Sequence, residues 1–129
     1  MGMQLLSALE KLHKLGYVHN DLKPDNVLIG YKSILNQLVG KAKCEQPTSI
    51  DEMNLSRLII IDFGIATKYL LPSGKHIEKT ESDRFKGSMI FASKNIFHFW
   101  ESSRRDDLIS LVYFLIFYLD ESRLTYIKE

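Results

Sequence analysis

The sequence lacks the features that mark secreted, membrane-spanning or nucleic-acid-binding proteins. It has a single cysteine, Cys44, among 129 residues, so no intrachain disulfide can form, as is usual for proteins of a reducing compartment. Its longest apolar run, residues 108–119, includes Ser110 and is too short to cross a bilayer. Its formal net charge of +1 gives no basic field that would attract nucleic acid or a membrane surface. We therefore expect a cytoplasmic or nuclear protein with neither nucleic acid nor membrane as a partner.

The composition that is present, 45% apolar and 26% charged, is typical of a globular domain. A first helix is predicted over residues 3–15, in which Leu5, Leu9 and Leu12 share one face. Gly16 follows directly, at the position where a residue with left-handed backbone angles commonly ends a helix. The pattern therefore predicts an amphipathic helix that packs by its leucine face.

A second helix is predicted over residues 104–119. Ser103 is a favourable N-cap, and Asp106 stands three residues later, as in a capping box. Apolar side chains occur on every face of this helix, and such a helix normally lies at the centre of a core. We therefore expect a buried central helix. Before it, residues 64–88 are charged and loop-like, and residues 93–99 predict a short helix.

Two apolar runs predict strands. One covers residues 27–29, and the other covers residues 58–61, which are β-branched-rich and are expected to form a buried strand. The second strand delivers Asp62 at its end, and Gly64 is expected to give Asp62 the backbone freedom to turn inward. The mixed, polar residues 31–56 between the strands predict an insertion.

The run H-N-D-L-K-P-D-N at residues 19–26, together with Asp62, supplies the groups that phosphoryl transfer from ATP requires. Asp21 can accept the proton of a substrate hydroxyl, and Lys23 can reach the γ-phosphate as a cation. Asn26 and Asp62 can offer oxygen atoms to Mg²⁺, which prefers such hard ligands. The pattern therefore indicates a phosphotransferase with ATP and Mg²⁺ as cofactors.

These residues also carry a resemblance. Residues 19–26 resemble the protein kinase catalytic loop H-R-D-L-K-P-x-N, and residues 62–64 resemble its metal-binding D-F-G. G-S-M-I-F-A-S at 87–93 and S-R-R-D-D-L-I-S-L at 103–111 resemble G-T-A-R-Y-A-S and S-R-R-D-D-L-E-S-L of the casein kinase I group. The resemblance implies a serine/threonine protein kinase that transfers the ATP γ-phosphate to protein hydroxyls. It also implies a protein-kinase-like α+β fold, with residues 1–129 forming a partial domain: a mostly helical C-terminal lobe with short β hairpins and no N-terminal lobe.

The same resemblance implies roles for further residues. Asp107 would support the backbone of the catalytic loop from the central helix, and Ser88 would hold a hydroxyl near the catalytic side chains. His19 and Phe63 would stack on each other. Leu28 would lie beneath the adenine of ATP. These roles are expectations from the resemblance alone.

The chain departs from the group at several positions. Asn20 stands where the group has an arginine that normally pairs with an anion near the activation segment, and Ile90 replaces the arginine of G-T-A-R-Y. Arg84 and Lys86 could supply a replacement anion site, although solvated loop charges are the commoner situation. The 129 residues contain no G-x-G-x-x-G, so we expect weak activity or none from this chain alone.

Two alternatives stay open. The chain could be a non-catalytic binding module derived from a kinase, with a partner that covers an exposed apolar surface. It could instead be a small-molecule phosphotransferase, because choline-kinase-like enzymes share H-N-D-L. Lys23-Pro24, the D-F-G at 62–64 and S-R-R-D-D-L at 103–108 argue against the second alternative.

Overall fold

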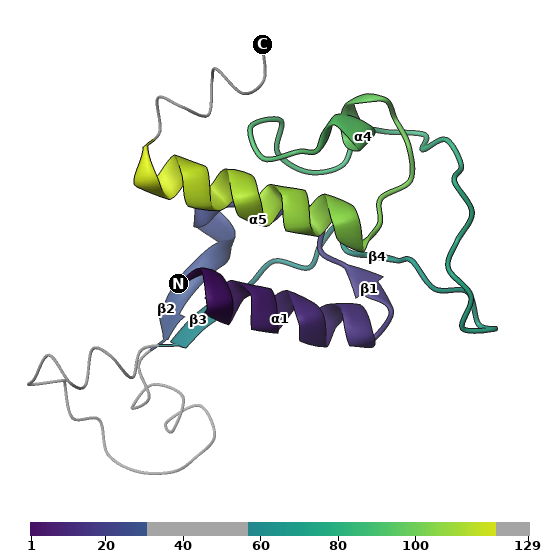
Figure 1. Ribbon diagram of the computed structural model, residues 1–129. Helices are drawn as coiled ribbons and strands as arrows, with labels where there is room; N and C mark the ends of the chain where they lie inside the picture. The colour runs from purple at the N-terminus through teal and green to yellow at the C-terminus, as the bar shows by residue number, and fades with distance from the viewer. Residues whose placement is uncertain (31–56, 121–129) are drawn as a thin grey trace, which may run out of the picture.

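The computed structural model describes residues 1–30 and 57–120, which form a small α+β structure (Figure 1). In chain order its elements are α1 (Gly2–Lys14), β1 (Tyr17–Val18), the 3₁₀ helix η1 (Pro24–Asn26), β2 (Val27–Gly30), β3 (Arg57–Ile60), β4 (Thr67–Lys68), α4 (Lys94–Phe97) and α5 (Arg104–Leu119). The two predicted long helices are thus confirmed. The predicted insertion at 31–56 lies outside the described residues.

Helix α1 packs by one face and ends where the sequence predicted. Leu5, Leu9 and His13 are its buried side chains, so the buried stripe runs at intervals of four residues and leaves Leu12 only half-buried. Gly16 has a φ of 86°, and its N–H donates to the His13 carbonyl at 2.9 Å. Glycine adopts this left-handed angle without steric cost and therefore ends the helix.

Helix α5 runs beside α1 and shares a hydrophobic core with it (Figure 1). The core side chains come from both helices, the loop before η1 and the segment before α4: Leu5, Leu9, Leu22, Phe91, Leu111 and Phe114. Burying a leucine of this kind contributes roughly 1.5–3 kcal/mol to the free energy of unfolding. This core fixes the position of α5 relative to the segment that follows α1.

The expectation that α5 is buried on every side was wrong for the residues that the structure describes. One face is buried, but Val112, Tyr118 and Leu119 are 52%, 65% and 84% exposed. The Ser103–Asp106 capping box is present, with the Ser103 N–H donating to the Asp106 carboxylate at 2.8 Å. The capping pair therefore correctly predicted the start of the helix. The uniform hydrophobicity of the helix did not predict its burial, because no described element covers its outer face.

Two antiparallel strand pairs bring distant parts of the chain together. Strand β2 pairs with β3, with Val27 opposite Ile60 and Gly30 opposite Arg57. Strand β1 pairs with β4, with Val18 opposite Thr67. Strand β3 was expected to be buried, but its residues are half-buried or exposed, because the described structure covers only one side of the β2–β3 ribbon. Residues 19–26 run from β1 to β2, and the residues after β3 run from β3 to β4. Both segments therefore connect the same two strand pairs.

The segment between β3 and α5 is more ordered than the predicted loop. It contains β4 and two isolated bridges, Leu70 to His76 and Glu81 to Trp100. Helix α4 is shorter than the predicted 93–99, because Phe99 takes a left-handed φ of 57° just after it. None of the helices within 1–30 and 57–120 is long and apolar enough to span a membrane.

Candidate active site

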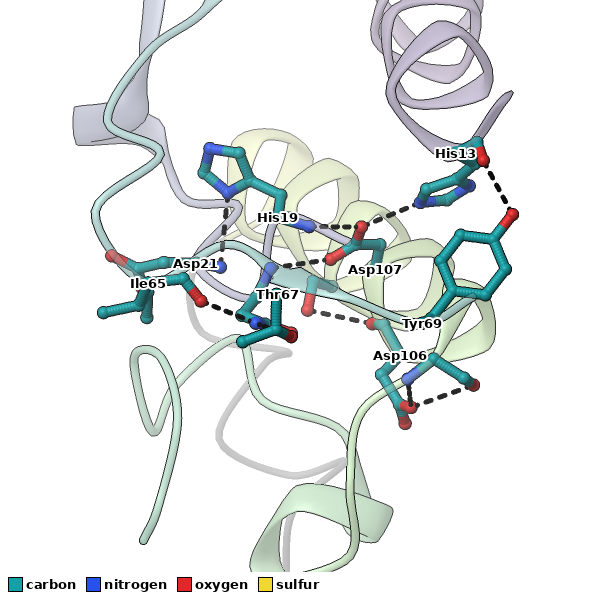
Figure 2. A network of polar contacts seen from close by, with 11 residues as sticks. His13, His19, Asp21, Ile65, Thr67, Tyr69, Asp106 and Asp107 are labelled. Carbon is teal, nitrogen blue, oxygen red and sulfur yellow. Dashed lines mark hydrogen bonds and ion pairs between the residues drawn. The ribbon is translucent and has the colours of Figure 1, made fainter. Parts of the chain in front are cut away.

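The loop at residues 19–26 is fixed to helix α5 through one buried carboxylate. Asp107 is 1% exposed, and its two oxygens accept the backbone N–H of His19 at 2.8 Å and of Asn20 at 2.9 Å. The same carboxylate accepts a third hydrogen bond from Nε2 of His13 at 2.8 Å, so α1, α5 and the loop meet at this residue (Figure 2). A carboxylate that accepts several hydrogen bonds in a buried setting holds its donors firmly, because leaving them unpaired would be costly.

His19 joins the loop to the end of β3. Its ring is fully buried, and Nε2 donates to the Ile61 carbonyl at 3.1 Å, while Nδ1 accepts the Asp21 N–H at 3.3 Å. These two partners require the tautomer with the proton on Nε2. The ring also meets that of Phe63 edge-on, with ring centroids 5.1 Å apart and an interplanar angle of 72°. The two rings were expected to stack, and the structure instead brings them together edge to face.

Asp21, Lys23 and Asn26 form one polar cluster. Lys23 Nζ lies 2.9 Å from Asp21 Oδ2, and the Asn26 side-chain amide donates to the same Oδ2 at 3.0 Å and to the Asp21 carbonyl at 2.8 Å. The second carboxylate oxygen of Asp21, Oδ1, is buried and has no hydrogen-bond partner among the described residues. A buried, unpaired carboxylate oxygen is unfavourable by roughly 1–3 kcal/mol. The cluster thus presents one acceptor that a hydrogen-bond donor would satisfy.

The charge of Lys23 is stabilised by its acidic neighbours. The hydrogen bond to Asp21 raises the pKa of Lys23 above its ordinary value. Burial opposes this as the next largest effect, and the negative charges of Asp21, Asp25 and Asp62 each add a smaller increment in the raising direction. Lys23 therefore stays protonated throughout the physiological pH range.

Asp62 lies just beyond β3 and next to the same cluster. The Ile61 N–H donates to the Asn26 carbonyl at 3.0 Å, which ties the residue before Asp62 to the loop. Asp62 itself has a left-handed φ of 61°. The freedom to turn that we expected from Gly64 therefore lies at Asp62, whereas the Gly64 N–H donates to Asp62 Oδ1 at 3.1 Å. Aspartate is one of the residue types that tolerate this backbone region.

Other predicted site residues lie at the edges of this cluster. Leu28 is half exposed on β2. Ser88 is half-buried, and its carbonyl accepts the N–H groups of Phe91 and Ala92 at 3.1 and 2.9 Å. The residue before it, Gly87, has a φ of 92°, and a Cβ built there would overlap the Asn20 carbonyl and lie 3.7 Å from Asp21 Oδ1. The backbone before Ser88 thus packs directly against the loop.

Lys86 differs from the solvated loop charge that the sequence suggested. It is 8% exposed, and its Nζ lies 2.6 Å from Glu101 Oε2. A buried amine needs such a partner. Lys86 is therefore committed to an internal ion pair, while Arg84 is exposed.

Comparisons with known proteins identify relatives of this chain. No family model matches the chain. The chain is 37% identical over 119 residues to "Casein kinase 1-like protein HD16" of Oryza sativa subsp. japonica, and 33% identical over 128 residues to "Probable casein kinase I homolog" of Encephalitozoon cuniculi. It is 36% identical over 116 residues to "Probable serine/threonine-protein kinase" of Dictyostelium discoideum. The chain is homologous to casein kinase I-like protein kinases.

These matches cover 91%, 99% and 90% of this chain. They cover only 14%, 33% and 20% of the three relatives. The chain therefore spans at most about a third of the length of the curated relatives it matches. The resemblance to the casein kinase I group that the sequence motifs predicted is confirmed.

Two residues that contact the site, His13 and Gly87, were not among the predicted site residues. His13 is buried, and its Nε2 lies 2.8 Å from a carboxylate oxygen of Asp107. Its position in the i, i+4 stripe after Leu5 and Leu9 could have indicated burial, and a buried imidazole needs a polar partner. Gly87 carried no such signal, because its contact with Asn20 depends on long-range packing.

Proposed function

We propose that the chain contributes the catalytic-loop half of a casein kinase I-like serine/threonine kinase site, with residues 1–129 corresponding to part of the C-terminal lobe of a kinase domain. The observation that carries the proposal is the unpaired, buried Oδ1 of Asp21. Its other oxygen is held by Lys23 and Asn26, so Oδ1 is the remaining acceptor for a substrate hydroxyl. Such a hydroxyl would be oriented for attack, which is the main contribution a protein makes to phosphoryl transfer.

Lys23 has the second role in this proposal. Its ammonium group is held at Asp21 and remains charged, because the surrounding carboxylates raise its pKa. It is 27% exposed, so it can reach a phosphoryl group without leaving a buried cavity. A fixed positive charge next to the acceptor hydroxyl stabilises the negative charge of a transferring phosphoryl group.

Asn26 and Asp62 fit the requirements of Mg²⁺. The amide nitrogen of Asn26 donates to Asp21, which directs its oxygen away from that residue, and Asp62 adds an exposed carboxylate just after β3. No group of three or more histidine, cysteine, aspartate or glutamate side chains gathers for a metal among the described residues. This sparse set suits Mg²⁺, which binds one or two protein ligands together with substrate phosphates and water. When bound as Mg-ATP, the metal would neutralise the phosphate charge.

A polypeptide of these 129 residues alone is proposed to turn over slowly. Its sequence has no G-x-G-x-x-G to cover phosphates, and each electrostatic element of this kind contributes on the order of 10²–10³ in rate. Leu28 and Ile29 on β2 and Phe63 of D-F-G are 50%, 60% and 50% exposed. A binding module that uses these side chains is the competing function.

The first experiment measures binding without requiring turnover. Mn²⁺ replaces Mg²⁺, and its paramagnetism broadens NMR signals close to the metal. With Mn²⁺ and ATP, broadening is expected at the amides of Asn26 and Asp62, to be lost in Asp62→Asn and kept in Asp25→Asn. Asp25 is the matched control because it is an exposed acid in the same loop. Equal broadening in both variants would contradict the proposed ligand set.

The second experiment measures phosphotransfer to serine, threonine and tyrosine peptides and to choline. Turnover restricted to serine and threonine peptides, lost in Asp21→Asn and kept in Asp25→Asn, would support the kinase assignment. Phosphorylated choline would favour the small-molecule alternative. Absence of both turnover and nucleotide binding would favour the binding module.

A further inference from the structure

Asn20 contacts three other segments of the chain. Its side-chain amide donates to the Ile65 carbonyl at 2.7 Å and to Thr67 Oγ1 at 2.9 Å, and its backbone N–H donates to Asp107 at 2.9 Å. Figure 2 shows Ile65 and Thr67 on one side of this network and Asp107 on the other. Its carbonyl abuts Gly87, where a Cβ would overlap it. Asn20 thus links the residues after D-F-G to the loop that carries Asp21.

The backbone at this position also favours asparagine. Asn20 has a φ of 72°, in the left-handed region that asparagine adopts far more often than most residues with a side chain. A β-branched side chain would be strained there. The short amide reaches Ile65 and Thr67 from this backbone, so conformation and hydrogen bonding select the same residue type.

The groups that form the hydrogen bonds between Asn20 and residues 65–67 are all uncharged. They are an amide, a backbone carbonyl and a hydroxyl, so the link does not depend on an ion pair. We propose that Asn20 is a positioning residue, whose side-chain amide holds Ile65 and Thr67 against the loop of Asp21 without a charged or phosphorylated group. The hydrogen bonds from Asn20 to Ile65 and Thr67 are features of the structure. Their importance for phosphotransfer rests on the proposed function.

The test is amide hydrogen exchange in the full chain, read at Ala66. The Ala66 N–H donates to the Phe63 carbonyl at 3.1 Å and lies between the two residues that Asn20 holds. Local release of the segment would speed exchange at Ala66, whereas global unfolding would also speed exchange in the middle of α5. Because exchange needs no catalysis, the result stands whether or not the proposed function fails.

Two substitutions remove the link to different degrees. Asn20→Asp keeps the size of the side chain but sets a carboxylate oxygen against the Ile65 carbonyl, while Thr67 can still donate its hydroxyl. Thr67→Val removes only the acceptor on Thr67. We expect Ala66 exchange to rise about tenfold or more in Asn20→Asp and about fivefold in Thr67→Val, as for loss of a neutral hydrogen bond. Thr67→Ser should restore the wild-type rate, and Thr80→Val, at an exposed threonine, should leave it unchanged.

Salt and phosphatase distinguish a neutral link from a charged one. Raising the salt concentration to about 1 M shortens the screening length to about 3 Å and weakens ion pairs, but it leaves neutral hydrogen bonds in place. Ala66 exchange in the wild-type chain should therefore be unchanged in high salt and after phosphatase treatment. Faster exchange in either condition, or equal rates in Thr67→Val and Thr67→Ser, would overturn the proposal.

Discussion

Asp107 should be the most sensitive polar residue of this fold to an isosteric change. In Asp107→Asn one oxygen becomes an NH₂ group, which can no longer accept a hydrogen bond. The arrangement that retains most bonds keeps an oxygen toward His19 and His13 and turns the NH₂ group toward the Asn20 N–H. One charge-assisted hydrogen bond is then lost, and a buried N–H faces another donor.

The expected loss in the free energy of unfolding is about 2–3 kcal/mol, the usual cost of leaving a buried donor unpaired beside a formerly charged acceptor. With a urea dependence of about 1–3 kcal/mol per molar, the midpoint of unfolding should fall by about 0.7–3 M. Urea unfolding followed by circular dichroism measures this shift. Asp83→Asn is the control, because Asp83 is exposed and such surface changes usually stay within about 0.5 kcal/mol.

A substitution at the neighbouring Asp106 distinguishes the loss of hydrogen bonds to the catalytic loop from a general loss of stability of α5. Its carboxylate is also buried, but it accepts from Ser93 at 2.6 Å and Ser103 at 2.8 Å, at the start of α5. Asp106→Asn should destabilise the fold without selectively speeding amide exchange at His19 and Asn20. The reasoning is refuted if Asp107→Asn shifts stability by less than about 0.5 kcal/mol, or if both variants release those two amides equally.

Two further predictions concern the cluster around Asp21. Removing its carboxylate in Asp21→Asn should lower the pKa of Lys23, observable by NMR titration of Nζ, because the hydrogen bond to Asp21 is the largest cause of the raised value. A raised lysine pKa adds to the free energy of unfolding only while the lysine is protonated. The stabilisation from Lys23 should therefore be complete below about pH 10.5 and be lost as the pH rises through the raised pKa. An unchanged Lys23 titration in Asp21→Asn would contradict this account. Gly87→Ala should destabilise the protein by at least about 2 kcal/mol, because the new Cβ meets the Asn20 carbonyl, whereas Gly74→Ala, with a φ of 77° and open space, should cost only about 1 kcal/mol of backbone strain. Equal losses in thermal or urea unfolding would contradict the contact with Asn20.

The sequence was sufficient for features that depend on neighbouring residues. The capping pair at Ser103 and Asp106 and the glycine at 16 correctly predicted helix ends, because these signals act within one or two turns. The apolar pattern predicted both long helices. The motifs predicted the resemblance to casein kinase I-like proteins, because they are local strings of residues.

Features that depend on distant residues were beyond these local signals. Strand β4 has two residues and exists because it pairs with β1, about fifty positions earlier in the chain. The burial of α5 could not be judged from its own sequence, since exposure depends on what packs against each face. His13 acquires its partner from α5, and the left-handed turn at Asp62 is set by the surrounding fold.

Because Gly30 pairs with Arg57, the geometry of the site does not depend on the number of residues between them. Gly30 and Arg57, the described residues on either side of 31–56, are directly opposed in the strand pair, which fixes their positions relative to each other. Doubling the number of residues that connect two such positions adds only about 0.6 kcal/mol of closure entropy. The register of β2 against β3, rather than the spacing between Asn26 and Asp62 in the sequence, sets where these two residues stand.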